Sequence, residues 1–195
     1  MSVRRRAAAL LLGLVALLSA CTASADDGGT TPAAPTTTWS APLRACPDQP
    51  DEPAAGEQTL PAVELACPGG GTLDLGRAPG VPTVVNLWAS WCGPCREELP
   101  LVQQLADLAG DRVSVVGVIS KDGIPQADSF ATDAGATFPS AYDRDGRLMD
   151  ELGVNVLPFT YLVDAGGALV HTKVGPVASV EELRALVAEH LGVQL

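Results

Sequence analysis

Short apolar runs in this chain give way to longer stretches in which apolar residues recur every three or four positions. Residues 84–88 and 113–119 form two such runs, and both are rich in β-branched residues, which predicts buried strands. Beyond Cys92 the spacing becomes helical, and Pro94 suits the first turn of a helix because no backbone N–H is needed there. The apolar stripe of this predicted helix consists of Leu99, Leu101, Val102, Leu105 and Leu108. The pattern therefore predicts a buried strand that leads directly into an amphipathic helix.

Further strands and helices are predicted on both sides of this unit. Residues 60–65 and 72–75, separated by three glycines, have the pattern of a hairpin. Ser179 is expected to cap the last helix, and Gly192 to end it. The other predicted elements are a helix over 125–134, a short strand over 138–143, a helical turn over 148–152, a strand that follows Pro158, its hairpin partner over 168–174 and the last helix over 179–190. This alternation predicts an α/β fold with a mixed sheet, in which the strand over 84–88 is central and helices cover both faces.

The N-terminus has the pattern of an export signal. Three arginines at residues 4–6 precede an apolar run over 7–20 that is too short to span a bilayer comfortably, so residues 1–20 are predicted to be a signal peptide. The run ends in Leu-Ser-Ala followed by Cys21, which resembles a bacterial lipobox. Cys21 is therefore expected to be lipidated and to become the mature N-terminus. The alternative is an ordinary cleaved signal followed by an incidental cysteine.

The next segment, residues 21–57, is rich in Thr, Pro and Ala. Such a composition buries little apolar surface, so this segment is predicted to be a disordered tether between the lipid and a folded domain over residues 58–195. Trp39 lies within the tether, and the sequence leaves open whether its side chain docks onto the domain.

Composition narrows the range of functions. Hydrophobic residues make up 47% of the chain, which is enough for a substantial core. The 12 Lys and Arg residues face 23 Asp and Glu residues, and three of the basic residues belong to the predicted signal. An acidic chain without a basic stripe argues against nucleic-acid binding.

The chemistry of the chain is indicated by Cys92-Gly93-Pro94-Cys95. Cys92 is predicted to lie at the start of a helix, where the unpaired N–H groups and the helix dipole favour a thiolate. In such motifs the pKa of a cysteine falls from about 8.5 to roughly 3.5–7.5. Cys92 is therefore predicted to attack a partner's sulfur and Cys95, one turn later, to resolve the mixed disulfide. The alternatives are a structural bridge or half of a zinc site, but a zinc site would need a second ligand pair at similar spacing, and the sequence has none.

Two cysteines remain, Cys46 and Cys67, and each precedes a proline. In an oxidising compartment a leftover pair usually forms a disulfide, which would staple the end of the tether to the domain. The rival interpretation is a second redox pair, although neither cysteine is predicted at a helix start. His171 and His190 have no metal-like partners in the sequence and are expected to be surface residues, so no metal site is predicted.

The residues around the motif resemble a known family. Residues 85–92 and 95–100 are similar to the exported TlpA/ResA/DsbE-like branch of the thioredoxin superfamily, and the resemblance extends from about residue 60 to the C-terminus. It implies a thioredoxin-like three-layer α/β sandwich with a mixed sheet. Thioredoxin itself has a buried Asp where this chain has Asn86. In ResA-like proteins the proton-shuttling carboxylate corresponds to Glu98; the alternative role for Glu98 is a solvated glutamate in the first helical turn.

The resemblance also implies a substrate groove beside the two cysteines. Its residues would be Trp91, Gly93 and Pro94 in the motif, with Leu157 and a cis Pro158 opposite them. Because the dithiol carries two electrons itself, no cofactor is expected.

These observations together predict an extracytoplasmic thiol–disulfide oxidoreductase, held on the outer face of the cytoplasmic membrane by a lipid anchor alone. Its expected partners are exported protein dithiols and disulfides, with apocytochrome c as a candidate, and a membrane redox protein. The favoured role is a reductant in cytochrome c maturation, and the alternative is an oxidase that introduces disulfides into secreted proteins. A peroxiredoxin-type peroxidase would need Thr or Ser where Ala89 stands, and a copper chaperone would need further soft ligands near the motif.

Overall fold

The structure of the protein is a computed structural model that describes residues 38–195. The predicted signal peptide, Cys21 and the first part of the predicted tether lie outside these residues. None of the helices in the described part of the chain combines the length and the apolar character needed to cross a bilayer.

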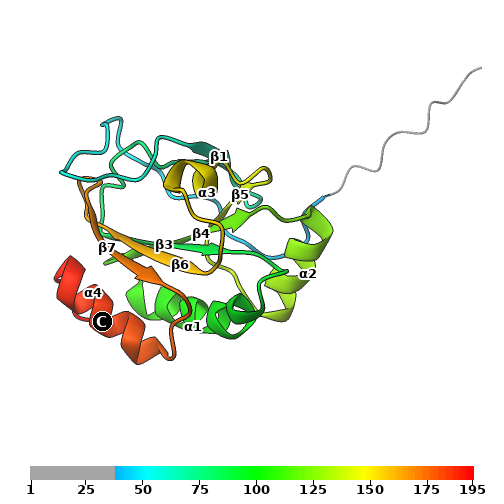
Figure 1. Ribbon diagram of the computed structural model, residues 1–195. Coiled ribbons are helices and arrows are strands. Elements are labelled where there is room, and N and C mark those ends of the chain that lie inside the picture. Colours follow the sequence, from blue (N-terminus) through cyan, green and yellow to red (C-terminus); the bar gives the residue numbers. More distant parts are fainter. Residues whose placement is uncertain (1–37) are drawn as a thin grey trace, which may run out of the picture. The chain divides into compact units, whose positions relative to one another are not determined.

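A five-stranded mixed sheet forms the centre of the domain (Figure 1). Strand β3 is central: it runs parallel to β4 and antiparallel to β6, while β5 and β7 form the two edges. In spatial order the strands are β5 (Ser140–Asp143), β4 (Ser114–Ser120), β3 (Thr83–Trp88), β6 (Phe159–Val163) and β7 (Leu169–Val174). All six residues of β3 are buried, as its nearly continuous apolar sequence predicts.

Helices and a small hairpin cover the two faces of the sheet. One face carries α1, α2 and α4, and the other carries α3 and the β1–β2 hairpin (Figure 1). Their bounds are α1 (Gly93–Ala109), α2 (Ile124–Asp133), α3 (Arg147–Leu152), α4 (Val180–Leu191), β1 (Glu64–Ala66) and β2 (Thr72–Asp74). The predicted three-layer α/β architecture is therefore confirmed. Strand β1 is shorter than the predicted strand over 60–65, which contains a proline at position 61.

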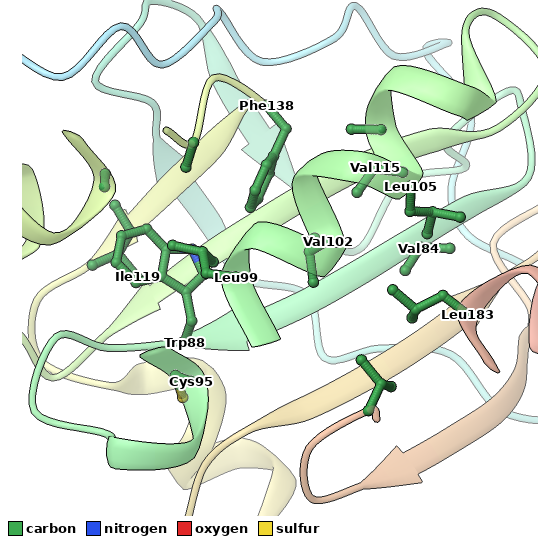
Figure 2. Close-up of a cluster of buried hydrophobic side chains, with 14 of the residues drawn as sticks. Val84, Trp88, Cys95, Leu99, Val102, Leu105, Val115, Ile119, Phe138 and Leu183 are labelled. Atoms are coloured by element: carbon green, nitrogen blue, oxygen red, sulfur yellow. The ribbon is translucent and has the colours of Figure 1, made fainter. Parts of the chain in front are cut away.

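Successive side chains of β3 pack into two separate hydrophobic cores, because they point to opposite faces of the sheet. Val84 and Trp88 pack beneath α1, where Leu99 and Leu105 complete a dry layer (Figure 2). The bare backbone of Gly117 leaves room for the Trp88 indole, because a Cβ there would approach Nε1 to 2.6 Å. Strand β3 is thus packed between two cores, and the position where it ends is fixed by packing on both sides.

The predicted tether, residues 21–57, needs correction in its second half. Trp39 lies edge-on to Tyr142 with ring centroids 5.4 Å apart, and Leu43 is only 6% exposed. The Asp128 carboxylate of α2 accepts hydrogen bonds from the backbone N–H groups of Ser40 and Ala41. Residues 38–57 therefore belong to the domain's surface layer. Average composition could not reveal this, because a few spaced apolar residues and one distant carboxylate hold the segment.

Candidate active site

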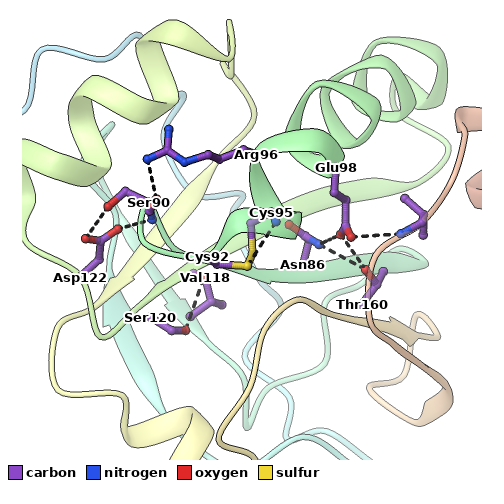
Figure 3. The surroundings of a disulfide bond; sticks show 11 residues. Asn86, Ser90, Cys92, Cys95, Arg96, Glu98, Val118, Ser120, Asp122 and Thr160 are labelled. Atoms are coloured by element: carbon purple, nitrogen blue, oxygen red, sulfur yellow. Dashed lines mark hydrogen bonds between the residues drawn. A yellow bond between two sulfur atoms is a disulfide. The ribbon is translucent and has the colours of Figure 1, made fainter.

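The two motif cysteines lie where β3 passes into α1. Cys92 is the N-cap of α1, and its sulfur accepts a hydrogen bond from the backbone N–H of Cys95 at 3.2 Å. The two cysteines form a disulfide with their Cα atoms 5.3 Å apart (Figure 3). In the reduced protein this N–H group and the positive end of the helix dipole would stabilise negative charge on the Cys92 sulfur. Pro94 occupies the first turn of the helix, as predicted.

A buried carboxylate holds the loop just before the cysteines. Asp122, two residues after the end of β4, accepts hydrogen bonds from the backbone N–H of Ser90 at 2.5 Å and from its hydroxyl at 2.8 Å. Arg96 donates to the Ser90 carbonyl from the other side at 2.9 Å, and its guanidinium lies over the Phe130 ring. Sequence patterns contain no signal for this clasp, because Ser90 and Asp122 are 32 residues apart. The clasp fixes the approach of the chain to Cys92.

Three of the predicted groove residues, Trp91, Gly93 and Pro94, adjoin the two cysteines along the chain. Trp91 is 53% exposed, and its indole N–H donates to the Lys121 carbonyl at 2.9 Å, so the ring is anchored yet open to a partner. Gly93 and Pro94 are also exposed.

The peptide bond between Leu157 and Pro158, the other two predicted groove residues, is cis, as the resemblance implied. Phe159 pairs with Leu87, which places Pro158 beside Trp88 at the end of β3. Leu157 is partly buried, whereas Val156 is 56% exposed. The exposed apolar side chain before the cis proline is therefore that of Val156, two residues away, and not that of Leu157.

Glu98 is buried, with only 1% of its surface exposed, so the solvated-glutamate interpretation is wrong. Its Oε1 accepts from Asn86 Nδ2 at 2.5 Å and from the Thr160 hydroxyl at 3.4 Å, and its Oε2 accepts from the backbone N–H of Val177 at 3.1 Å (Figure 3). Burial raises the pKa of Glu98, and the hydrogen bonds from Val177, Asn86 and Thr160 together with the charge of Lys173 offset only part of that rise. A carboxyl group in such a site therefore remains protonated to a higher pH than the carboxyl group of a surface glutamate.

Comparisons with known proteins agree with this geometry. The family described as Redoxin matches residues 54–187. The chain belongs to the redoxin family. Within it the chain is one of the thiol–disulfide oxidoreductases of the TlpA/ResA/DsbE-like branch, as the motif predicted.

Two curated relatives show how close the similarity is. Over 129 residues this redoxin is 38% identical to a thiol:disulfide interchange protein DsbE homolog of Paracoccus denitrificans, covering 65% of this chain and 66% of the relative. It is 33% identical over 138 residues to the thiol:disulfide interchange protein CycY of Rhizobium leguminosarum bv. viciae, covering 70% of this chain and 68% of the relative. The chain thus spans about two thirds of the length of these relatives.

A solved structure shows the same fold. A secreted Mycobacterium tuberculosis disulfide oxidoreductase, described as homologous to E. coli DsbE, superposes with a TM-score of 0.58 and 25% sequence identity. The alignment covers 66% of this redoxin and 96% of that chain. The thioredoxin-like fold expected from the resemblance is confirmed.

Two further cysteines and two histidines of this redoxin lie within the described residues. Cys46 and Cys67 form a disulfide with their Cα atoms 5.8 Å apart, and neither is at a helix start. His171 and His190 are partly buried, and their rings stack with centroids 3.9 Å apart, a contact that sequence reasoning missed. Within residues 38–195, no group of three or more His, Cys, Asp or Glu side chains is arranged to hold a metal ion.

Proposed function

We propose that this redoxin exchanges disulfides with exported proteins through Cys92 and Cys95. The observation that carries the proposal is the position of the Cys92 sulfur, which caps α1 and forms a disulfide with Cys95 beside the exposed side chain of Trp91. A sulfur stabilised as a thiolate beside a resolving cysteine is the arrangement that thiol–disulfide exchange requires.

When the protein acts as a reductant, the exchange has two steps. The Cys92 thiolate attacks a client disulfide; a Cys92–client bond forms, and the other client sulfur leaves as a thiolate. Cys95 then loses its proton and attacks the Cys92 sulfur, which forms the Cys92–Cys95 disulfide and releases the second client sulfur. Two electrons pass to the client, and Glu98, whose pKa is raised by burial, accepts the Cys95 proton for delivery to the departing thiolate.

The proposed direction is reduction, with apocytochrome c as the client class and a membrane redox protein as the source of electrons. The interchange proteins similar to this chain support an exchange role, and the buried Glu98 supports the ResA-like role that the motif implied. The second candidate is disulfide formation in secreted proteins, and it is favoured by the similar fold of the secreted disulfide oxidoreductase.

The reduction potential of the Cys92–Cys95 pair, measured against glutathione, separates the two directions. A value near about −270 mV, typical of thioredoxin, supports a reductant, and one near about −120 mV, typical of DsbA, supports an oxidant.

We also propose that the protein works outside the cytoplasm, anchored by a lipid on Cys21. The support is the signal-like pattern of residues 1–20 and the lipobox-like residues before Cys21. Replacing Cys21 with Ser is expected to move the protein from the membrane fraction to the soluble fraction of fractionated cells. Retention of the Cys21→Ser protein in the membrane fraction would contradict the proposed anchor.

The exchange reaction itself is tested with three variants. Cys92→Ser is expected to abolish insulin reduction and the oxidation of a reduced test protein. Cys95→Ser is expected to accumulate a mixed disulfide with the client on a non-reducing gel, because the resolving step is lost. The matched control is Cys46→Ala with Cys67→Ala, which removes the other disulfide and is expected to leave exchange intact. Full exchange activity in Cys92→Ser would overturn the proposal.

A further inference from the structure

One buried oxygen near the disulfide lacks a hydrogen-bond partner. Among the buried side-chain polar atoms of residues 38–195, Asn86 Oδ1 and Trp88 Nε1 are the two without one. Asn86 is 1% exposed and belongs to β3, the strand that leads to Cys92. A buried acceptor left unpaired costs free energy, so a donor that reached this oxygen in another redox state would stabilise that state.

The orientation of the Asn86 amide follows from its other contacts. Its Nδ2 donates to Glu98 Oε1 at 2.5 Å and to Thr160 Oγ1 at 3.2 Å. Turning the amide over would place Oδ1 against the carboxylate oxygen instead, which is repulsive while Glu98 is ionised. Oδ1 therefore points away from Glu98 and Thr160.

The unpaired oxygen lies on the side of Cys95. Cys95 and Glu98 are three residues apart on α1 and share one helix face, and both are 1% exposed. Side chains of a helix lean toward its N-terminus, so the Glu98 carboxylate and the amide bonded to it lie beneath the turn that carries Cys95. Figure 3 shows the Asn86 amide between Glu98 and Cys95.

We infer that Asn86 Oδ1 accepts a hydrogen bond from the Cys95 thiol in the reduced protein. The inference rests on the proposed dithiol reaction of Cys92 and Cys95. In the disulfide Cys95 carries no proton and cannot donate, which leaves the oxygen unpaired. Reduction by two electrons and one proton leaves the negative charge on Cys92, at the helix start, and the proton on Cys95, whose S–H then pairs with Oδ1.

This hydrogen bond has two consequences for the exchange reaction. It stabilises the reduced state relative to the oxidised state, and it keeps the resolving sulfur protonated until a mixed disulfide has formed. In the resolving step the Cys95 proton leaves, the Cys92–Cys95 bond forms and the Cys92–client bond breaks. The client departs as a thiolate that takes up one proton, so atoms and charge balance.

The S–H stretching vibration of Cys95 tests the contact directly. In Cys92→Ala the full chain retains Cys95 as a free thiol, and subtracting the infrared spectrum of Cys92→Ala/Cys95→Ala isolates its S–H band from that of any other thiol. The band is expected at a lower frequency, as for a hydrogen-bonded thiol, and is expected to shift upward when Asn86→Leu is added. Asn86→Val, a second variant without an acceptor, serves if the leucine variant does not fold.

The matched control is Thr160→Val, which removes a neighbouring hydroxyl without touching Oδ1 and is expected to leave the band unchanged. An unshifted band in Asn86→Leu or Asn86→Val, or a band that moves only in Thr160→Val, would overturn the inference. Because the measurement involves no client, it remains informative even if the exchange reaction fails with insulin.

The equilibrium with glutathione provides the second readout. Asn86→Leu is expected to lower the equilibrium constant for reduction of the Cys92–Cys95 disulfide about five-fold, since one hydrogen bond is lost only from the reduced state. The same five-fold decrease is expected in a Glu98→Gln background, where changes in the Glu98 charge cannot contribute. An unchanged constant in that background would contradict the inference.

Discussion

Glu98 lies one helical turn beyond Cys95 and is held by three donors in a site closed to solvent. Desolvation penalises its ionised form, so its pKa in the folded protein is above the unfolded value. Between the unfolded pKa of about 4.3 and the higher folded pKa of Glu98, the folded state therefore binds more protons than the unfolded state. In this interval the contribution of Glu98 to the free energy of unfolding decreases as the pH rises, and at higher pH it is constant.

Replacing Glu98 with Gln is expected to remove this pH-dependent contribution. The free energy of unfolding of the wild type, relative to that of Glu98→Gln, should fall as the pH rises from about 4 through the folded pKa of Glu98. Urea unfolding at a series of pH values gives the difference. The matched control is Glu97→Gln, one position earlier and exposed. Both this variant and the wild type retain Glu98, so the difference between their free energies of unfolding should show no such decrease. A difference between wild type and Glu98→Gln that is flat with pH would contradict the raised pKa.

At the scale of elements, α2 does more than cover one face of the sheet. Its Asp128 holds the segment around Ser40 and Ala41, and Tyr142 of β5 receives the edge of Trp39. Tyr142 in turn donates its hydroxyl to the backbone carbonyl of Asp122 at 2.8 Å. The point where the described chain begins is thereby connected, through α2 and β5, to the loop that holds Ser90 before Cys92.

Replacing Asp128 with Ala is expected to release this segment. Burial raises the pKa of Asp128, but the hydrogen bonds from Ser40 and Ala41 together lower it by more than burial raises it. The pKa of Asp128 therefore lies below its ordinary value. Its stabilisation is therefore present above about pH 3.9 and is lost as the pH falls through the folded pKa. The cost of Asp128→Ala at neutral pH should be about 1 kcal/mol, because the contacts are partly exposed.

Limited proteolysis near residue 40 and Trp39 fluorescence measure the release of the segment. Asp133→Ala, an exposed acidic residue on the same helix, is the matched control and should leave the segment in place. Equal protection of the segment in Asp128→Ala and wild type would show that Trp39 and Leu43 suffice to hold it.

At the scale of the whole molecule, the Cys46–Cys67 disulfide connects the N-terminal surface segment to the β1–β2 hairpin across 21 residues of chain. Both cysteines pack in the core between the hairpin and the sheet. A cross-link of this kind acts mainly on the unfolded chain, whose conformational freedom it restricts, so its effect extends to the stability of the entire domain.

Removing this disulfide with Cys46→Ala and Cys67→Ala is expected to lower the free energy of unfolding by about 3 kcal/mol. The Cys92–Cys95 bond, which joins positions only three residues apart, closes a much shorter loop, so Cys92→Ala with Cys95→Ala should cost less by this mechanism. Urea unfolding under non-reducing conditions compares the two pairs. A larger loss from the Cys92–Cys95 pair would contradict the loop-closure account.

Features that depend on neighbours along the chain were predictable from the amino-acid sequence. The apolar run of β3, Pro94 in the first turn of α1 and the spacing of Cys92 and Cys95 predicted a strand, a helix and a redox pair, because propensity, capping and disulfide reach are local properties. Ser179 and Gly192 likewise marked the ends of α4. The cis bond before Pro158 followed from resemblance and not from local propensity.

The environments of individual polar side chains, in contrast, depend on contacts between residues far apart in the chain. Glu98 is buried because Asn86, Thr160 and Val177 converge on it from other elements, and the Ser90–Asp122 clasp joins residues 32 positions apart. The stacking of His171 on His190 also depends on how β7 and α4 pack. Burial and hydrogen bonding of these groups are set by long-range packing, which hydrophobic periodicity and composition do not encode.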